Sequence, residues 1–270
     1  MLARVISGIL MAGGIAAILI YGPWWVLALV VGLALVLCAH EYQRMARPDA
    51  PGVERGAFIV ACAAVAAYPV IAKWWPTYTH SMSFLVAFYI LTITRLARPD
   101  PIESSLRRLG LDLAGLMYIG VTFPFVIILR GESPEGGFVL LMVMVVAFSS
   151  DTGGYFAGRF LGKHKLYPKI SPKKTIEGAI GGIVMAIGGM FAARAYFPGL
   201  DGLTPIDCIL MGAFGACFTI IGDLVESMMK RAFGVKDSGA LIPGHGGILD
   251  RIDGLLFCGP FLWLYLEVMQ

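Results

Sequence analysis

Residues 227–253 are the most polar part of a hydrophobic sequence, and they combine carboxylates, basic side chains, a histidine and several glycines. Carboxylate oxygens bind a hard cation such as Mg2+, whereas basic side chains and backbone N–H groups bind phosphate oxygens. The segment therefore indicates a site for a metal and a phosphate. Its candidate residues are Lys230, Arg231, Lys236, Asp237, His245, Asp250, Arg251 and Asp253. His245 could donate to a phosphate or carry a proton, but a hydrogen bond within the loop is the favoured alternative.

Asp223 lies just before this segment, at the end of an apolar run. An ionised carboxylate near the centre of a bilayer costs about 2.5 to 3.5 kcal/mol, so acids at such positions indicate function. On a helix, Asp223, Glu226 and Ser227 share a face and could point into one polar cavity. The alternative is a helix end that emerges into water beside Lys230 and Arg231.

A second polar group lies between residues 149 and 178. Its sequence SPKKTIEG is typical of a helix start, with Thr175 or Ser171 as the cap and an acid in the first turn. Lysines at a helix N-terminus are unfavourable unless an anion is bound there, for example a nucleotide phosphate or a lipid headgroup. A basic loop lying on anionic lipid is the alternative. The candidates are Asp151, Ser171, Lys173, Lys174, Thr175 and Glu177.

The elements that position these residues are long apolar runs, which predict an all-α, polytopic transmembrane bundle. The chain is 58% hydrophobic and 14% charged, its mean hydropathy is +0.78, and soluble domains carry about 25% charged residues. About nine helices are predicted because nine apolar runs can be drawn. They cover residues 5–21, 23–39, 57–72, 81–95, 111–129, 137–157, 177–197, 206–226 and 254–269.

The basic residues predict how this bundle is oriented. If the nine helices alternate in direction, 18 of the 21 Lys and Arg residues fall on one side of the membrane. The positive-inside rule places that side, with the N-terminus and both polar groups, in the cytoplasm. The first hairpin turns on Gly22 and Pro23, so a broken or re-entrant helix is an alternative there. The net charge of +3 is too small to indicate a nucleic-acid partner.

We expect one integral membrane domain over residues 1–270, with N-terminal helices at 1–140 and a catalytic half at 141–270. Residues 1–21 are interpreted as a membrane helix and not as a cleaved signal, because no convincing cleavage site follows. The five cysteines lie in apolar segments and are interpreted as packing residues. Glycines four residues apart, at 154, 158 and 162 and at 178 and 182, favour tight helix packing over ligand contact and are compatible with a homodimer.

The segment 227–253, with the sequence SMMKRAFGVKDSGALIPGHGGILDRID, resembles the signature of the CDP-diacylglycerol synthase (phosphatidate cytidylyltransferase) family. The preceding SPKKTIEG supports this resemblance, whereas residues 1–140 resemble the family only in being hydrophobic. The resemblance implies a magnesium-dependent reaction of CTP with phosphatidic acid that gives CDP-diacylglycerol and pyrophosphate in phospholipid synthesis. It also implies an enzyme of the bacterial cytoplasmic membrane whose active site faces the cytoplasm.

The resemblance further implies roles for individual residues. Asp223 and Asp250 would be ligands of one Mg2+ or of two cations. Second choices, either for the metal or for orienting the basic residues, are Asp151, Glu226, Asp237 and Asp253. The phosphate-binding residues would be Lys230, Arg231, Lys236, His245 and Arg251. The nucleotide or headgroup pocket would involve Ser171, Lys173, Lys174, Thr175 and Glu177.

Two other classes of membrane protein use similar residues. An ion-coupled transporter would scatter acids near the membrane midplane, whereas the charges here gather at one border. A phosphotransferase that acts on a CDP-alcohol or a polyprenyl phosphate would also need acids and magnesium, but the strings D-G-x-x-A-R and D-D-x-x-D are absent from the sequence. A cytidylyltransferase therefore remains the favoured hypothesis.

Overall fold

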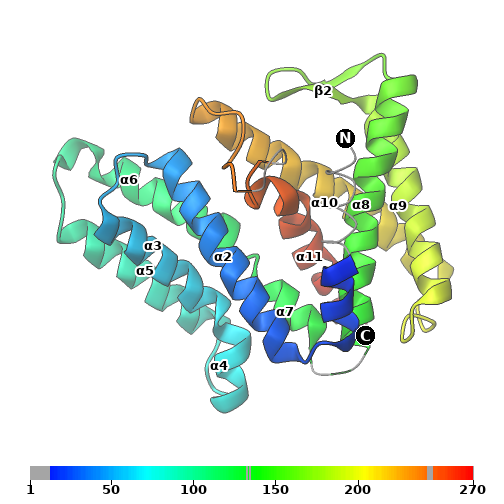
Figure 1. The fold of residues 1–270 in the computed structure, drawn as a ribbon, viewed down its shortest axis with the longest axis horizontal. Helices are drawn as coiled ribbons and strands as arrows, with labels where there is room; N and C mark the ends of the chain where they lie inside the picture. Colours follow the sequence, from blue (N-terminus) through cyan, green and yellow to red (C-terminus); the bar gives the residue numbers. More distant parts are fainter. Residues whose placement is uncertain (1–12, 132, 134, 242–245, 270) are drawn as a thin grey trace. The chain divides into compact units, whose positions relative to one another are not determined.

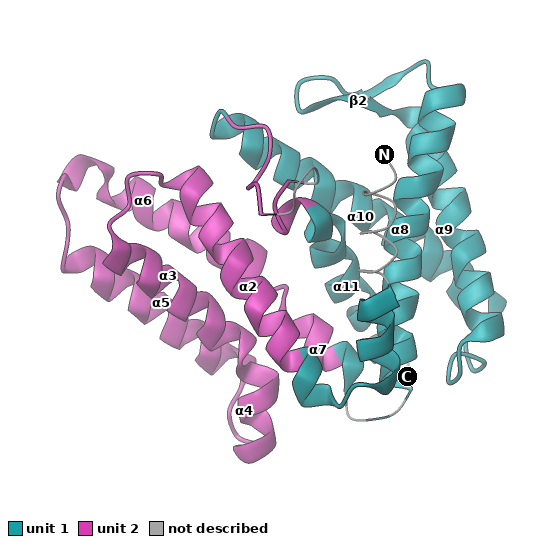
Figure 2. Cartoon of the chain, viewed as in Figure 1, with its two compact units in different colours: residues 1–27, 129–234, 251–270 teal, residues 28–128, 235–250 magenta. Residues whose placement is uncertain are grey.

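The computed structural model describes residues 13–131, 133, 135–241 and 246–269. The chain forms two compact units, which are described separately (Figures 1 and 2). Unit 1 comprises residues 1–27, 129–234 and 251–270, and unit 2 comprises residues 28–128 and 235–250. The expected single membrane domain, with its division near residue 140, stays a prediction.

The described residues are mainly helical, as the apolar runs predict. Among the described residues, six helices are long and apolar enough to cross a bilayer, or seven if a bent pair is counted as one span. The chain is therefore an integral membrane protein. The expected number of nine is approximate: the apolar runs coincide with helices or with pairs of helices, and the described residues hold ten α-helices besides the helical residues 13–21.

Unit 1 contains the helices α8 (Gly136–Phe160), α9 (Ile176–Tyr196) and α10 (Pro205–Ala232), together with most of α11 (Leu249–Met269). A two-stranded antiparallel hairpin of β1 (Lys165–Tyr167) and β2 (Ser171–Thr175) joins α8 to α9. Figure 1 shows this hairpin at the end of the α8–α9 pair. The SPKKT segment is thus a strand, not only a loop, within an otherwise helical fold.

Close packing of α8 on α9 depends on glycines at the places where the two backbones meet. A Cβ atom on Gly178 would lie 2.9 Å from the carbonyl oxygen of Gly154 and 3.3 Å from the Cα atom of Gly158. A Cβ atom on Gly182 would lie 2.7 Å from the carbonyl oxygen of Ser150. Larger residues would push the helices apart, so the glycine rows serve the predicted helix packing. They do so within a single chain.

Unit 2 contains most of α2 (Trp24–Ala46), then α3 (Gly52–Ala66), α4 (Tyr68–Trp74), α5 (His80–Leu96) and α6 (Ile102–Gly115). A short π-helix, η1 (Leu116–Gly120), follows α6, and α7 (Pro124–Arg130) runs from unit 2 into unit 1. The helices α3 and α4 form the bent pair, with an angle of 53° between them. Pro69 lies in the first turn of α4, where its missing N–H group is tolerated.

The helices that flank residues 227–253 are longer than the apolar runs predict. The helix α10 continues to Ala232, so Ser227, Lys230 and Arg231 are helical and not part of a loop. The helix α11 begins at Leu249, so Asp250 and Asp253 lie in its first turns. The expected starts and ends were wrong here because polar residues can extend a helix past its apolar run when their side chains are paired.

Candidate functional site

A pocket of about 430 Å3 in unit 1 brings together the two polar ends of α8 and α10 with the hairpin. We call it the carboxylate pocket. Its acids are Asp151 and Asp223. The other lining residues are Ser150, Gly154, Tyr155, Gly158, Arg159, Leu166, Lys173, Lys174, Thr175, Gly178, Ala179 and Ile220. The pocket therefore joins the second polar group, residues 149–178, to Asp223, the acid that precedes the segment 227–253.

Lys174 and Asp223 form the central ion pair of this pocket. The Nζ atom of Lys174 lies 2.7 Å from Oδ2 of Asp223, and both side chains are partly exposed. Ser227, one helical turn after Asp223, donates its hydroxyl hydrogen to Oδ1 of Asp223 over 3.2 Å. Both oxygens of Asp223 thus have a partner, and the expected shared face of Asp223 and Ser227 is observed.

Asp253 comes close to Asp223 because two glycines let α11 approach α10. A Cβ atom on Gly222 would lie 2.5 Å from the carbonyl oxygen of Asp253, and one on Gly254 would lie 2.7 Å from the Cγ2 atom of Thr219. Asp253 also accepts a 2.8 Å hydrogen bond from the backbone N–H group of Gly254. Each of the two acids thus lies next to a glycine at this helix contact.

The carboxylates of Asp151, Asp223 and Asp253 repel one another. Asp253 lies within electrostatic range of both other acids, and Asp151 within range of Asp223. Lys174 and Arg251 act on Asp151 as opposing positive charges, and Lys230 acts on Asp253. Gathering three acids costs free energy unless a cation offsets the repulsion. The arrangement is suited to binding a positive ion.

Mg2+ fits these donors in its chemistry. In the described part of the chain, no group of three His, Cys, Asp or Glu side chains is arranged to hold a metal ion alone. Mg2+ seldom needs such a cage, because it commonly binds to one or two carboxylates, substrate phosphates and water. Asp223, with Asp151 or Asp253, can supply that number of oxygens. The presence of two acids, Asp151 and Asp223, in the lining of one pocket is the observation that favours a cation there.

Asp250, the other expected metal ligand, lies in unit 2 and has a different environment. Its Oδ2 atom accepts hydrogen bonds from the backbone N–H groups of Ser238 (2.9 Å) and Gly247 (2.8 Å) and from the hydroxyl of Ser238 (2.9 Å). These bonds hold the segment that precedes α11. Asp223 belongs to unit 1, so joint metal coordination by Asp223 and Asp250 stays a prediction.

The other site residues that were predicted within the segment 227–253 are divided between the two units. Lys230 pairs with the fully buried Glu226 in α10, which contradicts the expected opening of Glu226 into a shared cavity. Arg231 and Arg251 are exposed residues of unit 1, and Lys236 and Asp237 are exposed residues of unit 2. His245 lies outside the described residues.

In the SPKKT region, two predicted substrate-binding residues make local contacts. Thr175 caps α9 by accepting a 3.1 Å hydrogen bond from the N–H group of Gly178. Glu177 accepts hydrogen bonds from the backbone N–H groups of Lys163 (3.0 Å) and His164 (3.2 Å), and its Oε1 lies 2.6 Å from Nδ1 of His164. Glu177 therefore fastens the hairpin to α9. Lys173 and Lys174 line the pocket, whereas Ser171 begins β2.

Unit 2 also holds a buried group of paired charges that the sequence reasoning missed. We call it the ion network, formed by Arg47, Glu54, Arg95 and Asp112. Arg47 lies 2.7 Å from Asp112 and contacts Glu54, and Arg95 lies 2.7 Å from Glu54. Gln43 donates a 2.7 Å hydrogen bond to Asp112. Charges inside or beside apolar runs, such as Arg95 and Asp112, were the signal that could have revealed it.

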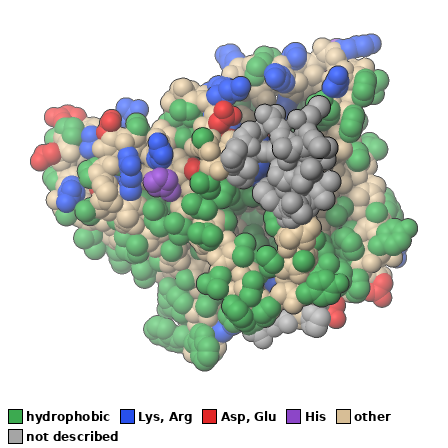
Figure 3. All heavy atoms as spheres, in the orientation of Figure 1, with side chains coloured by type: hydrophobic (Ala, Val, Ile, Leu, Met, Phe, Trp, Pro, Cys, Tyr) green, Lys and Arg blue, Asp and Glu red, His purple; other side chains and the backbone are tan. Residues whose placement is uncertain are grey.

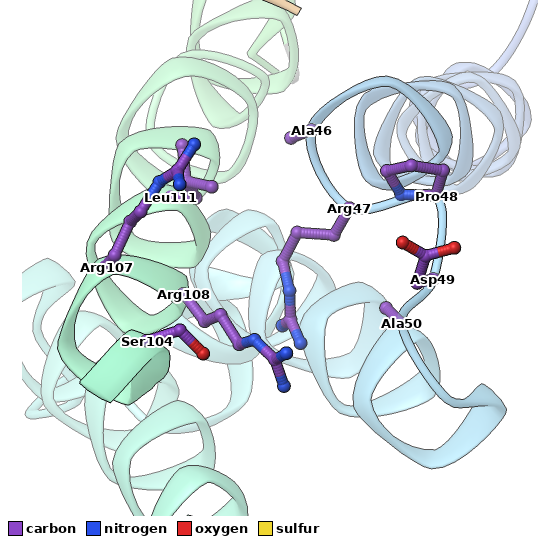
Figure 4. Close-up of a pocket in the computed structure, with 9 residues that line it drawn as sticks. All are labelled: Ala46, Arg47, Pro48, Asp49, Ala50, Ser104, Arg107, Arg108 and Leu111. Carbon is purple, nitrogen blue, oxygen red and sulfur yellow. The ribbon is translucent and has the colours of Figure 1, made fainter. Parts of the chain in front are cut away.

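Figure 4 shows a smaller pocket of about 260 Å3 beside this network, between the end of α2 and α6. The side chains of Arg47 and Arg108 extend toward one another there. Arg47 is already neutralised by the acids of the ion network.

In each unit taken alone, most visible Lys and Arg side chains gather at one end, while hydrophobic side chains cover much of the remaining visible surface (Figure 3). This distribution suits a membrane protein with charged ends.

Comparison with known proteins agrees with the signature segment. A relative from Bacillus subtilis, named phosphatidate cytidylyltransferase, is 43% identical over 163 residues, which are 60% of this chain and 59% of the relative. A protein of that name from Brucella suis is 43% identical over 158 residues, 58% of this chain and 57% of the relative. One from Staphylococcus aureus (strain COL) is 39% identical over 190 residues, 67% of this chain and 65% of the relative.

The matched part thus covers less than two thirds of each of these relatives. The model of the cytidylyltransferase family matches residues 2–269. That match extends through the N-terminal helices, which the signature segment does not reach. Because it includes nearly every residue of both units, the chain belongs to the cytidylyltransferase family.

Proposed function

We propose that this protein is a phosphatidate cytidylyltransferase, a membrane nucleotidyltransferase of phospholipid biosynthesis. In the reaction, a phosphate oxygen of phosphatidic acid attacks the α-phosphorus of CTP. A bond forms between that oxygen and the α-phosphorus, and the bond from the α-phosphorus to the bridging oxygen of the β-phosphate breaks. The products are CDP-diacylglycerol and pyrophosphate. Family membership and the names of the relatives support this choice of substrates.

The observation that carries the proposal is the crowding of Asp151, Asp223 and Asp253 beside basic residues at the end of membrane helices. A phosphatidate oxygen is already anionic at neutral pH, so the reaction requires little help from a general base. Its main obstacle is the repulsion between two phosphates, and positioning and electrostatic stabilisation lower that barrier. When bound, Mg2+ would neutralise negative charge on the phosphates of CTP.

The chain's own residues have separate tasks in this proposal. Asp223, with Asp151 or Asp253, supplies carboxylate oxygens for Mg2+, and Asp250 is a further candidate ligand. Lys174 holds Asp223 in place and offers a positive charge to a phosphate. Lys173 lines the same pocket, and the other proposed phosphate-binding residues are Lys230, Arg231, Lys236, His245 and Arg251.

The pocket also suits a ligand that is both lipid and phosphate. Tyr155, Leu166, Ala179 and Ile220 give it an apolar part beside its charged part. A lipid headgroup needs the charged part, whereas the adjoining acyl chains need an apolar route. We propose that phosphatidic acid enters from the inner leaflet and CTP from the cytoplasm. The positive-inside distribution supports this orientation, and the bacterial relatives support a place in the bacterial inner membrane.

Purified protein in detergent tests this function directly. Labelled CTP, phosphatidic acid and Mg2+ should give labelled CDP-diacylglycerol and pyrophosphate, and removal of Mg2+ with EDTA should abolish the product. Diacylglycerol, which lacks the attacking phosphate, is the matched control substrate. Absence of CDP-lipid from folded protein under these conditions would contradict the proposal. Light scattering of the same sample would test the homodimer, which stays a prediction.

A further inference from the structure

Glu41 is a buried acid in α2 that has no part in the proposed chemistry. It is 7% exposed. Its Oε1 atom accepts a 3.0 Å hydrogen bond from the N–H group of Ile248, and its Oε2 atom accepts one of the same length from Leu249. The hydroxyl of Ser238 lies 3.2 Å from Oε2. All of these residues belong to unit 2, so one carboxylate binds both Ser238 and the start of α11.

The two backbone bonds make Glu41 a remote cap for α11. The first N–H groups of a helix have no partner inside it, and acceptors from other parts of the chain can satisfy them. A negative charge at this end also interacts favourably with the helix dipole. Glu41 lies 208 residues before Leu249 in the sequence. A buried acid bound by these donors holds the start of α11 against α2.

Glycines at two positions permit this close approach. A Cβ atom on Gly239 would lie 2.7 Å from Oε1 of Glu41, and one on Gly247 would lie 2.5 Å from Oε2. Gly246 has φ of +85°, which other residues rarely adopt, and a Cβ atom there would lie 2.6 Å from Oδ2 of Asp250. The backbone at Gly239, Gly246 and Gly247 therefore lies very close to two carboxylates, those of Glu41 and Asp250.

Ser238 connects these carboxylates. Its hydroxyl lies 3.2 Å from Oε2 of Glu41 and 2.9 Å from Oδ2 of Asp250. A hydroxyl has one hydrogen to donate, so Ser238 can donate to only one of the two carboxylates at a time, although it lies between them. Its own N–H group is also bound to Asp250. A substitution at Glu41 will therefore alter the orientation of Asp250, because Ser238 and the first turn of α11 connect the two residues.

We propose that Glu41 is a positioning residue for the active site: it fixes the segment before α11 and so sets the orientation of Asp250. This inference rests on the proposed function for its catalytic consequence. Glu41 touches neither substrate nor reacting atoms in this role. Groups that orient metal ligands through hydrogen bonds commonly change metal affinity or activity by about 10- to 100-fold when they are removed.

The test compares wild-type protein with Glu41→Gln. The amide keeps the shape of the side chain, but its NH2 group faces a backbone N–H donor, so at least one bond is lost. Hydrogen exchange of peptides covering residues 246–252 should become about tenfold faster, as expected for one lost hydrogen bond to a charged group. The Mg2+ concentration for half-maximal activity should rise about tenfold. Glu41→Asp, which keeps the charge, should restore part of both effects.

Glu103→Gln is the matched control, because Glu103 is an exposed acid of unit 2 in the first turn of α6. It should change neither exchange nor the Mg2+ requirement. Ser238→Ala is a second variant should Glu41→Gln fail to fold: it removes the connecting hydroxyl, keeps both acids and should act in the same direction with smaller size. Its lack of any effect would then overturn the inference.

The outcomes separate the two proposals. An unchanged rate of hydrogen exchange over residues 246–252 in Glu41→Gln would overturn the inference that Glu41 fixes this segment. Faster exchange with an unchanged Mg2+ requirement and turnover would overturn its positioning role. If the wild-type protein forms no CDP-lipid, the proposed function fails, and the exchange measurement still decides whether Glu41 holds the segment.

Discussion

The ion network of unit 2 and the carboxylate pocket of unit 1 are built from the same kinds of side chain. In the network, two arginines and two acids pair with each other, and all four are nearly inaccessible. The pocket is lined by Asp151 and Asp223, Asp253 lies near both, and Lys174 and Asp223 are partly exposed. Paired buried charges hold helices together, whereas crowded, accessible acids are ready to bind a cation.

The largest effect should come from breaking the ion network. Arg47→Met leaves Glu54 and Asp112 with one arginine between them, and an uncompensated buried charge costs about 3 to 5 kcal/mol. We expect thermal unfolding in detergent at a clearly lower temperature, with turnover per folded molecule unchanged. Arg98→Met, at an exposed position, is the control. Normal stability of Arg47→Met with lost turnover would reverse the assignment of the network to structure.

The reverse pattern should follow a change in the carboxylate pocket. Asp223→Asn should lower kcat by about 10²- to 10³-fold, the size seen when one electrostatic contact to a transition state is removed. Its unfolding temperature should stay equal or rise, because repulsion among the acids decreases. Asp201→Asn, in an exposed turn of unit 1, is the control. Full Mg2+-dependent activity of Asp223→Asn would exclude Asp223 from metal binding.

A smaller effect is expected at the cation of the pocket. Lys174→Met removes the 2.7 Å ion pair with Asp223 and one positive charge near the phosphates. We expect kcat/KM for CTP to fall about tenfold, as for one hydrogen bond to a charged group. Lys169→Met, in the turn of the same hairpin, should act like wild type, since it lies outside the pocket lining. Equal losses in both variants would indicate general attraction of anionic lipid.

The smallest effect tests whether Thr175 is a cap or binds substrate. Thr175→Ala removes the acceptor for the N–H group of Gly178 and should cost about 1 kcal/mol of stability. Thr175→Ser keeps the hydroxyl and should restore it. If Thr175 acts only as a helix cap, the KM for CTP should be unchanged in both variants. A raised KM with normal stability in Thr175→Ala would instead support the role predicted from sequence.

Several features of the site could be predicted because they depend on local sequence. Long apolar runs predicted the helices, and the start of α9 at Ile176 follows from the cap Thr175. The pairing of Asp223 with Ser227 follows from helical spacing. The helical placement of Asp250 and Asp253 could not be predicted from hydropathy, because it depends on a start to α11 that Glu41 caps from far along the chain.

The amino-acid sequence by itself determined that this protein enters a membrane and which family it belongs to, since both depend on composition and on a contiguous motif. Only the tertiary structure decided which acids are fixed by hydrogen bonds or ion pairs and which lie close to other acids. Glu41, Asp112 and Asp223 are all acids at the borders of apolar runs. Their environments differ because donors and charges from distant helices surround each one, and no local pattern encodes those neighbours.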